Sequence, residues 1–247
     1  HAIYTVSGDL LKSMKEIADE NNLMYHIHIS ETKNEVDECI KKNGVTPVKY
    51  LDNLGVLGEN FIGAHGVWLD EEEIQLLGQR GGCVVHNPVS NMKLAVGSVL
   101  DYKGLISNSV NVCLGSDGCA SNNNLDMFEE MKVAALLQKS YYNDPTRLCA
   151  GEVFDMATVN GYKALGLKGG KIEEGFIADL CLVDLSGVMM IPNHNLVSNL
   201  VYSANGSVVD TVVCGGDVLM ENRVVKDEDK IVEEGIGAAE EIVGNGS

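Results

Sequence analysis

Basic residues are scarce in this sequence, where 18 lysines and arginines are outnumbered by 36 aspartates and glutamates, for a net charge of −18. A chain with this balance repels nucleic acid and anionic membrane surfaces, so we expect neither as a partner. Long apolar runs are also lacking, because no stretch approaches the roughly 20 residues of a membrane-spanning helix. The first residues show no signal-peptide pattern. The charge favours solubility and excludes these binding classes without indicating a function.

Paired cysteines are lacking as well: the seven cysteines form no C-x-x-C motif, and their number is odd. This pattern disfavours a zinc ribbon or a disulfide framework and favours a cytoplasmic protein. A length of 247 residues allows one large domain, or one domain with a small companion. The chain starts at His1, inside a motif, and not at a methionine, so we expect it to be the later part of a longer protein.

Four short apolar runs alternate with helical patterns along the first part of the chain. The apolar runs cover residues 23–29, 61–65, 83–86 and 110–115. The helical patterns cover residues 7–21, 33–42, 47–54, 70–77, 96–107, 124–141 and 146–165. Ser7 is placed to cap the first helix, and Asp70 with Glu73 forms a capping box for the fourth. Apolar strands that alternate with helices are typical of a parallel sheet covered by helices, which predicts an α/β fold.

A polar residue that can carry chemistry follows or ends each apolar run. These residues are His28, His65, His86 and Asp117. Active sites lie at the carboxyl ends of the strands both in a (β/α)₈ barrel and in a doubly wound open sheet. We therefore expect the four side chains to gather at one edge of the sheet, while the pattern alone leaves both architectures open.

The types of these residues suggest a metal and a base. Zinc takes imidazole and carboxylate ligands, and a catalytic zinc keeps one position open for water. Glu31 follows His28 by three residues, which puts a carboxylate beside the water that such a metal activates. A lone H-x-x-E also arises by chance, from a core histidine and a glutamate at a helix start. The succession of His28, Glu31, His65 and Asp117 at successive strand ends favours the site.

The pattern of the sequence changes at Gly169, where alternating strands and helices give way to short strands. Short strand patterns over residues 178–185, 208–213 and 218–225, separated by turns, predict an antiparallel sheet. We therefore expect a first domain over residues 1–168, a small β unit over residues 169–225, and an acidic tail or helix over residues 226–247.

Four motifs carry a resemblance to a known family. They are His28-Ile29-Ser30-Glu31-Thr32, Gly63-Ala64-His65-Gly66-Val67, His86-Asn87-Pro88-Val89-Ser90-Asn91-Met92-Lys93-Leu94 and Gly115-Ser116-Asp117-Gly118-Cys119-Ala120-Ser121-Asn122-Asn123. With them the chain resembles the chlorohydrolase and deaminase branch of the amidohydrolase superfamily. It is most similar to the 5′-methylthioadenosine/S-adenosylhomocysteine deaminases, and the resemblance covers essentially the whole chain.

The resemblance implies a distorted TIM (β/α)₈ barrel, of which the strands from the fourth or fifth to the eighth are present, with a small β-sandwich domain. It implies one divalent metal, most often Zn²⁺, with Fe²⁺ or Mn²⁺ as alternatives. The family's first-strand H-x-H pair of metal ligands is absent. His26 and His28 are not that pair, because Asp117, the expected eighth-strand ligand, follows only three strands later.

By the same resemblance, each matching residue acquires a role. His28 and Asp117 are metal ligands, and Glu31 and His65 flank the attacking water. The predicted catalytic residues are Glu31, His65 and Asp117. His1 corresponds to a histidine that contacts the substrate, and Glu31 and Asp117 complete the predicted substrate-binding set.

The function implied is hydrolytic deamination of 5′-methylthioadenosine, S-adenosylhomocysteine or adenosine, which yields the inosine derivative and ammonia. The expected partner is thus a small purine nucleoside, and we expect a homo-oligomer. One alternative keeps the site but changes the substrate to guanine, cytosine or a triazine, with an amine or chloride as leaving group. Another is a catalytically dead scaffold on the same fold, which the presence of all four site residues disfavours.

Overall fold

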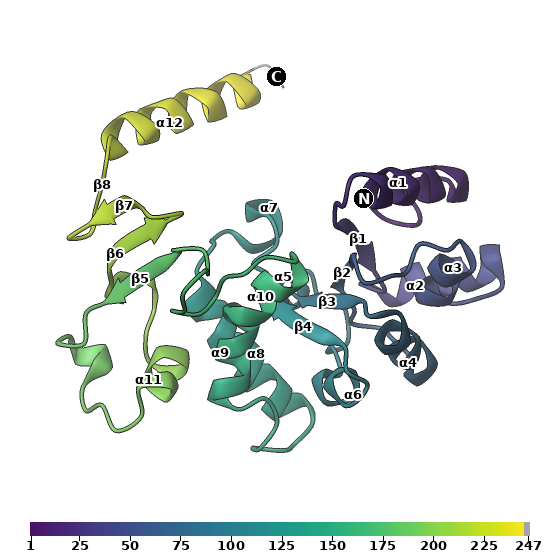
Figure 1. The fold of residues 1–247 in the computed structure, drawn as a ribbon, viewed down its shortest axis with the longest axis horizontal. Helices are drawn as coiled ribbons and strands as arrows, with labels where there is room; N and C mark the ends of the chain where they lie inside the picture. The colour runs from purple at the N-terminus through teal and green to yellow at the C-terminus, as the bar shows by residue number, and fades with distance from the viewer. Residues whose placement is uncertain (245–247) are drawn as a thin grey trace.

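A computed structural model describes residues 1–244 as a mixed α/β structure with two separate sheets (Figure 1). The first sheet is parallel throughout, with its strands in sequence order. Its strands are β1 (Tyr25–Ile29), β2 (Phe61–His65), β3 (Cys83–His86) and β4 (Asn111–Leu114). The predicted parallel sheet is therefore confirmed, and its carboxyl ends meet at one edge.

Helices connect these strands and follow them along the chain. In the first part they are α1 (Gly8–Glu20), α2 (Lys33–Asn43), α3 (Pro47–Asn53), α4 (Glu71–Arg80), α5 (Pro88–Lys93), α6 (Tyr102–Ser107), α7 (Cys119–Asn122), α8 (Met127–Tyr141), α9 (Ala150–Ala157) and α10 (Val159–Ala164). The predicted caps are present: Ser7 accepts a hydrogen bond from the N–H of Leu10, and Asp70 and Glu73 form a reciprocal capping box. Each such cap stabilises its helix by about 1 kcal/mol.

One face of the parallel sheet packs against the helices and forms the main core. Its strand residues include Ile27, Ile29, Phe61, Val84 and Val112, all of them buried. Helix residues that pack in the same cluster include Leu51, Leu77, Leu105, Ala134 and Met156. Side chains alternate along a strand, so the intervening residues point to the opposite face. There His26, Ile62, Val85 and Cys113 line a cavity of about 470 Å³.

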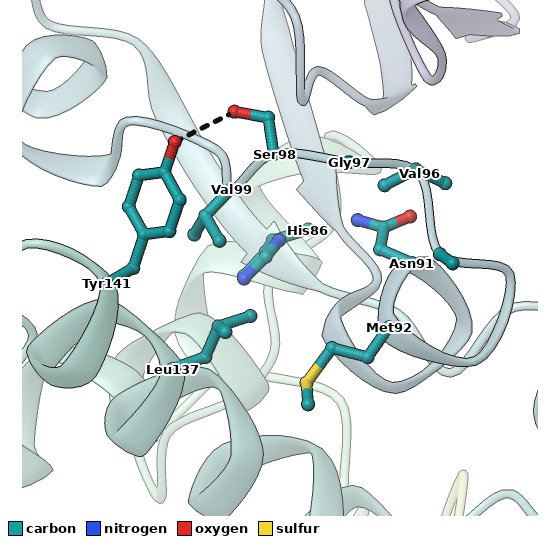
Figure 2. Close-up of a pocket in the computed structure, with 10 residues that line it drawn as sticks. His86, Asn91, Met92, Val96, Gly97, Ser98, Val99, Leu137 and Tyr141 are labelled. Atoms are coloured by element: carbon teal, nitrogen blue, oxygen red, sulfur yellow. Dashed lines mark hydrogen bonds between the residues drawn. The ribbon is translucent and has the colours of Figure 1, made fainter.

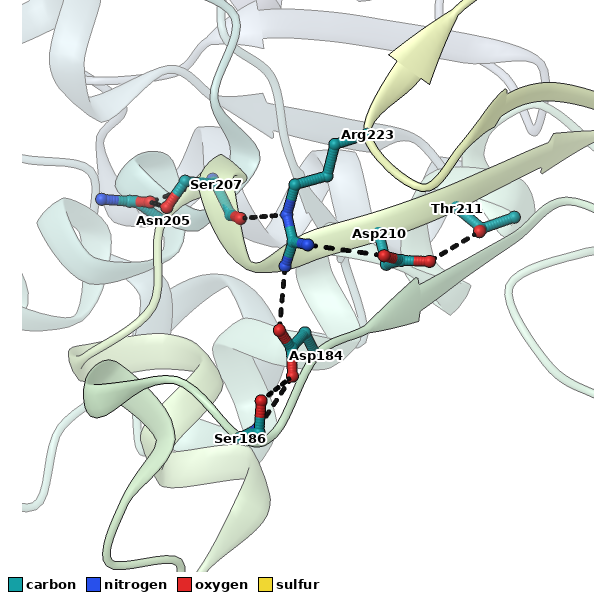
Figure 3. A network of polar contacts seen from close by, with 7 residues as sticks. All are labelled: Asp184, Ser186, Asn205, Ser207, Asp210, Thr211 and Arg223. Atoms are coloured by element: carbon teal, nitrogen blue, oxygen red, sulfur yellow. Dashed lines mark hydrogen bonds and ion pairs between the residues drawn. The ribbon is translucent and has the colours of Figure 1, made fainter.

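The second sheet is antiparallel, as the sequence predicted. Its strands are β5 (Leu180–Val183), β6 (Val209–Cys214), β7 (Asp217–Glu221) and β8 (Val224–Val225), paired in that order. Between β5 and β6 lie the short helices η1 (Val188–Met190), α11 (Leu196–Tyr202) and η2 (Gly206–Val208). Arg223 joins this unit: it donates to the carboxylates of Asp184 (3.1 Å) and Asp210 (3.4 Å) and to the carbonyl of Ser207 (3.2 Å) (Figure 3).

The last described element, α12 (Glu228–Gly244), extends from β8 away from both sheets (Figure 1). None of its residues is buried. The tail predicted over residues 226–247 is thus helical as far as Gly244, and residues 245–247 lie outside the described part. Within residues 1–244, no helix combines the length and apolar character needed to cross a membrane.

Candidate active site

The chain adopts a left-handed backbone conformation where it leaves three of the parallel strands. The residues concerned are Ser30 (φ 46°), His65 (φ 75°) and Asp117 (φ 60°). This conformation costs a non-glycine residue on the order of 1–2 kcal/mol, and such residues cluster at functional sites. The turns redirect the chain at one edge of the sheet, where parallel pairing sets Ile29 beside His65.

The structure brings His28, Glu31, His65 and Asp117 together at this edge. The rings of His28 and His65 stack with their centroids 5.2 Å apart. Nε2 of His65 lies 3.9 Å from Oε2 of Glu31. Asp117 lies near both rings, and after the hydrogen bonds from Ser90 and Gly118, His65 and His28 make smaller contributions to lowering its pKa. A water placed among these groups would meet two imidazoles and two carboxylates.

His28 is held by the backbone of His1. Its Nδ1 lies 2.8 Å from the carbonyl oxygen of His1, and its backbone N–H donates to that oxygen over 3.0 Å. A carbonyl oxygen can only accept, so Nδ1 carries the proton and Nε2 keeps its lone pair. Metal-ligating histidines are oriented in this way by a backbone carbonyl. The ring of His1 lies 4.5 Å from that of His28, between centroids.

Asp117 is held as a carboxylate. Burial alone raises its pKa, but hydrogen bonds to both oxygens outweigh that effect and set the pKa below the usual range. Ser90 Oγ donates to Oδ2 over 2.6 Å, and the N–H of Gly118 donates to Oδ1 over 2.7 Å. An ionised carboxylate beside an imidazole whose Nε2 is not hydrogen-bonded to the protein fits a divalent cation such as zinc.

These two residues fit a metal but do not complete its site. A catalytic zinc takes three protein ligands and keeps a further position for water. Within residues 1–244, no group of three or more His, Cys, Asp and Glu side chains is arranged to hold a metal. His28 and Asp117 are thus two candidate ligands among the described residues, and their assignment to a metal stays a prediction.

Glu31 owes its position to Glu35, which the sequence analysis did not single out. The buried carboxylate of Glu35 accepts from the N–H groups of Ser30 (3.0 Å) and Glu31 (2.8 Å). Thr32 caps the helix that carries Glu35. The turn after β1 is therefore fixed by hydrogen bonds, and the side chain of Glu31 projects from it toward His65.

Ser90 and Asn91 also support the site and were not predicted to do so. Both lie on α5, where Ser90 holds Asp117 and Asn91 Oδ1 lies 2.8 Å from Nδ1 of His65. The available signal was Pro88, since proline is favoured at the first position of a helix. It predicts a helix that starts at the end of β3 and brings these polar side chains over the site.

Two other histidines that end or line the strands do not join this cluster. His26 lines the cavity on the open face of the sheet. The ring of His86 turns into a different cavity, beside α8, although its strand ends at the same edge (Figure 2). Of the four strand-end residues, three meet and His86 faces away.

Comparison with known proteins identifies the family. Residues 1–219 match the model of the Amidohydrolase family, and the chain belongs to it. It is 52% identical to a 5′-deoxyadenosine deaminase of Methanospirillum hungatei over 94% of this chain and 52% of that protein. It is 47% identical to 5-methylthioadenosine/S-adenosylhomocysteine deaminase 1 of Archaeoglobus fulgidus over 99% of this chain and 59% of that protein.

Solved structures of related enzymes superpose well on the chain. An adenosine deaminase from Xanthomonas campestris with bound zinc gives a TM-score of 0.90 at 39% identity, covering 94% of this chain and 53% of that one. An atrazine chlorohydrolase from Arthrobacter aurescens in complex with zinc gives 0.85 at 26% identity, covering 92% and 51%. The chain thus spans about half the length of the proteins it matches.

Proposed function

We propose that the protein is a metal-dependent aminohydrolase that converts an adenosine derivative and water into the corresponding inosine derivative and ammonia. The observation that carries the proposal is the meeting of His28, Glu31, His65 and Asp117 at one sheet edge. The relatives that match at about half identity are named 5′-deoxyadenosine and methylthioadenosine/S-adenosylhomocysteine deaminases. We therefore infer a substrate whose ribose is altered at the 5′ carbon.

For the architecture, we propose that β1 to β4 are the last four strands of a distorted (β/α)₈ barrel. The support is the parallel order of the strands, together with the match to zinc-bound amidohydrolase structures. The antiparallel sheet would then be part of a small β-sandwich. On this view the barrel portion covers residues 1–168, the sandwich portion 169–225, and the tail 226–247.

For the metal, we propose one divalent ion, zinc by preference, held by His28 Nε2, Asp117 and further ligands from outside this chain. Iron(II) and manganese(II) are the alternatives. The support lies in the orientation of His28 by the His1 carbonyl and in the low pKa of Asp117. When bound, such an ion lowers the pKa of water toward neutrality and supplies hydroxide at pH 7.

The protein residues move the protons. Glu31 accepts a proton from the attacking water, passes it to the ring nitrogen beside the reacting carbon, and later helps the amine leave as ammonia. His65, facing Glu31, hydrogen-bonds the attacking water and orients it. Asp117 accepts the second proton of the water, and this proton is passed to the amine, which leaves as ammonia. The exchange balances, because one water enters and one ammonia leaves.

Substrate contacts are proposed for Glu31, for Asp117 and for His1, whose ring lies 4.5 Å from that of His28. The relatives at 25–26% identity include triazine hydrolases, whereas the deaminases reach about 50%. This difference favours an adenosine derivative over a triazine, guanine or cytosine. A dead scaffold is disfavoured by the intact hydrogen bonds around Asp117 and His65. We further propose a cytoplasmic homo-oligomer.

The test is ammonia release by the full-length protein from a panel of substrates. We expect the highest kcat/KM with 5′-deoxyadenosine, 5′-methylthioadenosine or S-adenosylhomocysteine, less with adenosine, and none with guanine, cytosine or atrazine. The Asp117→Asn variant, assayed alongside, should be inactive. A preference for a triazine or for cytosine would reject the proposed substrate class, and no turnover of any compound would favour the scaffold.

A further inference from the structure

A cavity of about 220 Å³ lies behind the active site, between α5, α8 and the loop that joins α5 to α6 (Figure 2). Its lining includes His86, Asn91, Met92, Val99, Leu137 and Tyr141. Ser98 and Tyr141 close one side with a hydrogen bond between their hydroxyls, 3.3 Å apart. Most of the remaining wall is apolar, so only a few polar atoms face the cavity.

His86 is the most unusual of these polar groups. Only 1% of the residue is exposed, and neither ring nitrogen has a hydrogen-bond partner among the residues that the structure describes. A buried polar atom without a partner is unfavourable, because it has lost its hydrogen bonds to water and gained none in the protein. Burial, assisted by the charge of His65, lowers the pKa of His86 to about 3, so the ring is neutral and offers one donor and one acceptor.

Asn91 connects this cavity to the active site. Its Oδ1 lies 2.8 Å from Nδ1 of His65, and its buried Nδ2 also has no partner among the described residues. Figure 2 shows that nitrogen turned toward the ring of His86. The side chains of Asn91 and His86 thus both face the cavity, and each has a polar atom without a partner. An ordered water commonly bridges two such groups when they make no direct hydrogen bond.

We propose that Asn91 and His86 are positioning residues for His65, joined by water that the cavity holds between the free N–H of Asn91 and a nitrogen of His86. Because Asn91 Oδ1 can only accept, the network keeps the His65 proton on Nδ1. The lone pair of Nε2 is then directed at Glu31, 3.9 Å away. Asn87 Nδ2 also approaches Nδ1 of His65, but at the longer distance of 3.4 Å.

The effect of this network on catalysis rests on the proposed deaminase function. A His65 ring with its proton on Nε2, or free to rotate, could not accept a hydrogen bond from the attacking water. The substrate should still bind, because neither His86 nor Asn91 is among the proposed substrate contacts. Disruption of the network should therefore lower kcat and leave KM nearly unchanged.

The kinetic test compares three variants of the full-length protein. His86→Phe keeps a ring in place but removes both nitrogens, and kcat should fall about 10- to 100-fold, as for partners that orient residues in metal sites. His86→Gln, which can still donate and accept, should restore most of kcat. Leu137→Met is a volume-conserving change in the same cavity wall, and its kcat should equal that of the parent. Parent kcat in His86→Phe, or an equal loss in all three variants, would overturn the proposal.

A second measurement needs no activity, and its reading of the parent protein needs no His86 variant. ¹⁵N-histidine labelling gives a spectrum of the histidine rings, in which the His65 signals are assigned by their loss in His65→Gln. The parent protein should show His65 as a single tautomer protonated on Nδ1, and His86→Phe should show a mixture. Protonation on Nε2 in the parent would overturn the proposal. If the parent releases no ammonia, the proposed function fails, while this readout still decides the positioning role.

Discussion

Glu31 is the residue on which proton transfer depends, and Glu35 holds its backbone in place. Glu31→Gln keeps the shape of the side chain but removes the proton acceptor. Turnover should fall by about 10²–10⁴-fold, the usual contribution of a general acid–base group. Metal content should stay at the parent level, because Glu31 is not proposed as a ligand. Steady-state kinetics and elemental analysis of the same sample measure both.

The matched control is Glu38→Gln, an exposed position on the helix that follows Glu31. It removes the same charge near the site and should leave turnover unchanged. Near-parent turnover in Glu31→Gln would transfer the proton-shuttling role to another group, with His65 as the next candidate. Loss of metal in Glu31→Gln would instead identify Glu31 as a ligand.

Glu130 makes the stability of the protein depend on pH. Only 1% of the residue is exposed, and burial, with smaller repulsion from Glu129 and Asp117, raises its pKa to about 7. The pKa of Glu130 in the folded protein is thus higher than the value of about 4.3 in the unfolded chain. Its contribution to the stability of the fold is therefore fully present below about pH 4.3 and is lost as pH rises through about 7. Glu130→Gln should therefore raise the free energy of unfolding by about 1–3 kcal/mol at pH 8 and little at pH 5.

Urea unfolding at the two pH values measures this difference. Glu130 accepts from the amide of Asn122 over 2.6 Å, and glutamine can keep that bond. The exposed Glu16 offers a control, since Glu16→Gln should change neither value. Equal stability of Glu130→Gln and the parent at pH 8 would show that the carboxyl is not buried in the ionised form.

At the residue scale, the sequence predicted the site candidates but not their supports. His28, His65 and Asp117 could be identified because they end apolar runs, and the ends of parallel strands must meet. Asn91 supports the site because its side chain points toward His65 from a six-residue helix. A helix this short shows no hydrophobic periodicity in the sequence from which that direction could be predicted. His86 fits the same strand-end pattern, yet its ring packs against α8, and only tertiary packing decides such an orientation.

At the element scale, Gly78 lets α4 pack closely against the end of α6. A Cβ at this position would lie 2.0 Å from the carbonyl oxygen of Asn108, which is backbone and cannot rotate away. Gly78→Ala should thus destabilise the protein by about 1–3 kcal/mol, although alanine is the better helix former. Gly151→Ala in α9, where nothing lies within 4 Å, should be neutral or stabilising by up to about 1 kcal/mol.

Chemical denaturation of the two alanine variants makes this comparison. Both changes add one methyl group to a helical glycine, so helix propensity favours alanine in each case. A difference between them reports the contact with Asn108. Equal stability of Gly78→Ala and the parent would mean that α4 and α6 are less closely packed than the structure shows.

The strands of the parallel sheet were predicted to within two residues, whereas the single strand pattern over 218–225 is two strands, β7 and β8, and several helices were misplaced. A buried parallel strand has to be apolar, which marks its place in the sequence. The helix predicted over 124–141 starts only at Met127, because Asp126 caps it by accepting from the N–H of Phe128. The helix predicted over 146–165 is two helices, broken at Thr158 (φ −127°, ψ −98°), although the sequence there contains no proline.

At the scale of the whole molecule, metal binding should need more than this chain. The full-length protein should carry one divalent ion, and its content should drop sharply in His28→Ala and in Asp117→Asn. The 247-residue chain alone should bind weakly, because a catalytic zinc takes three protein ligands and only two are proposed here. Elemental analysis measures the stoichiometry, with the exposed His194→Ala as control. Unchanged content in both ligand variants would refute the assignment.

The central claim is that the protein replaces the amino group of an adenosine derivative with oxygen from water. The most direct measurement is turnover of 5′-deoxyadenosine by the full-length protein in H₂¹⁸O, with the product analysed by mass spectrometry and the ammonia quantified. The account predicts a 5′-deoxyinosine product with one ¹⁸O on the purine ring and one ammonia released per product. Product without ¹⁸O, or cleavage of the glycosidic bond in place of ammonia release, would contradict it.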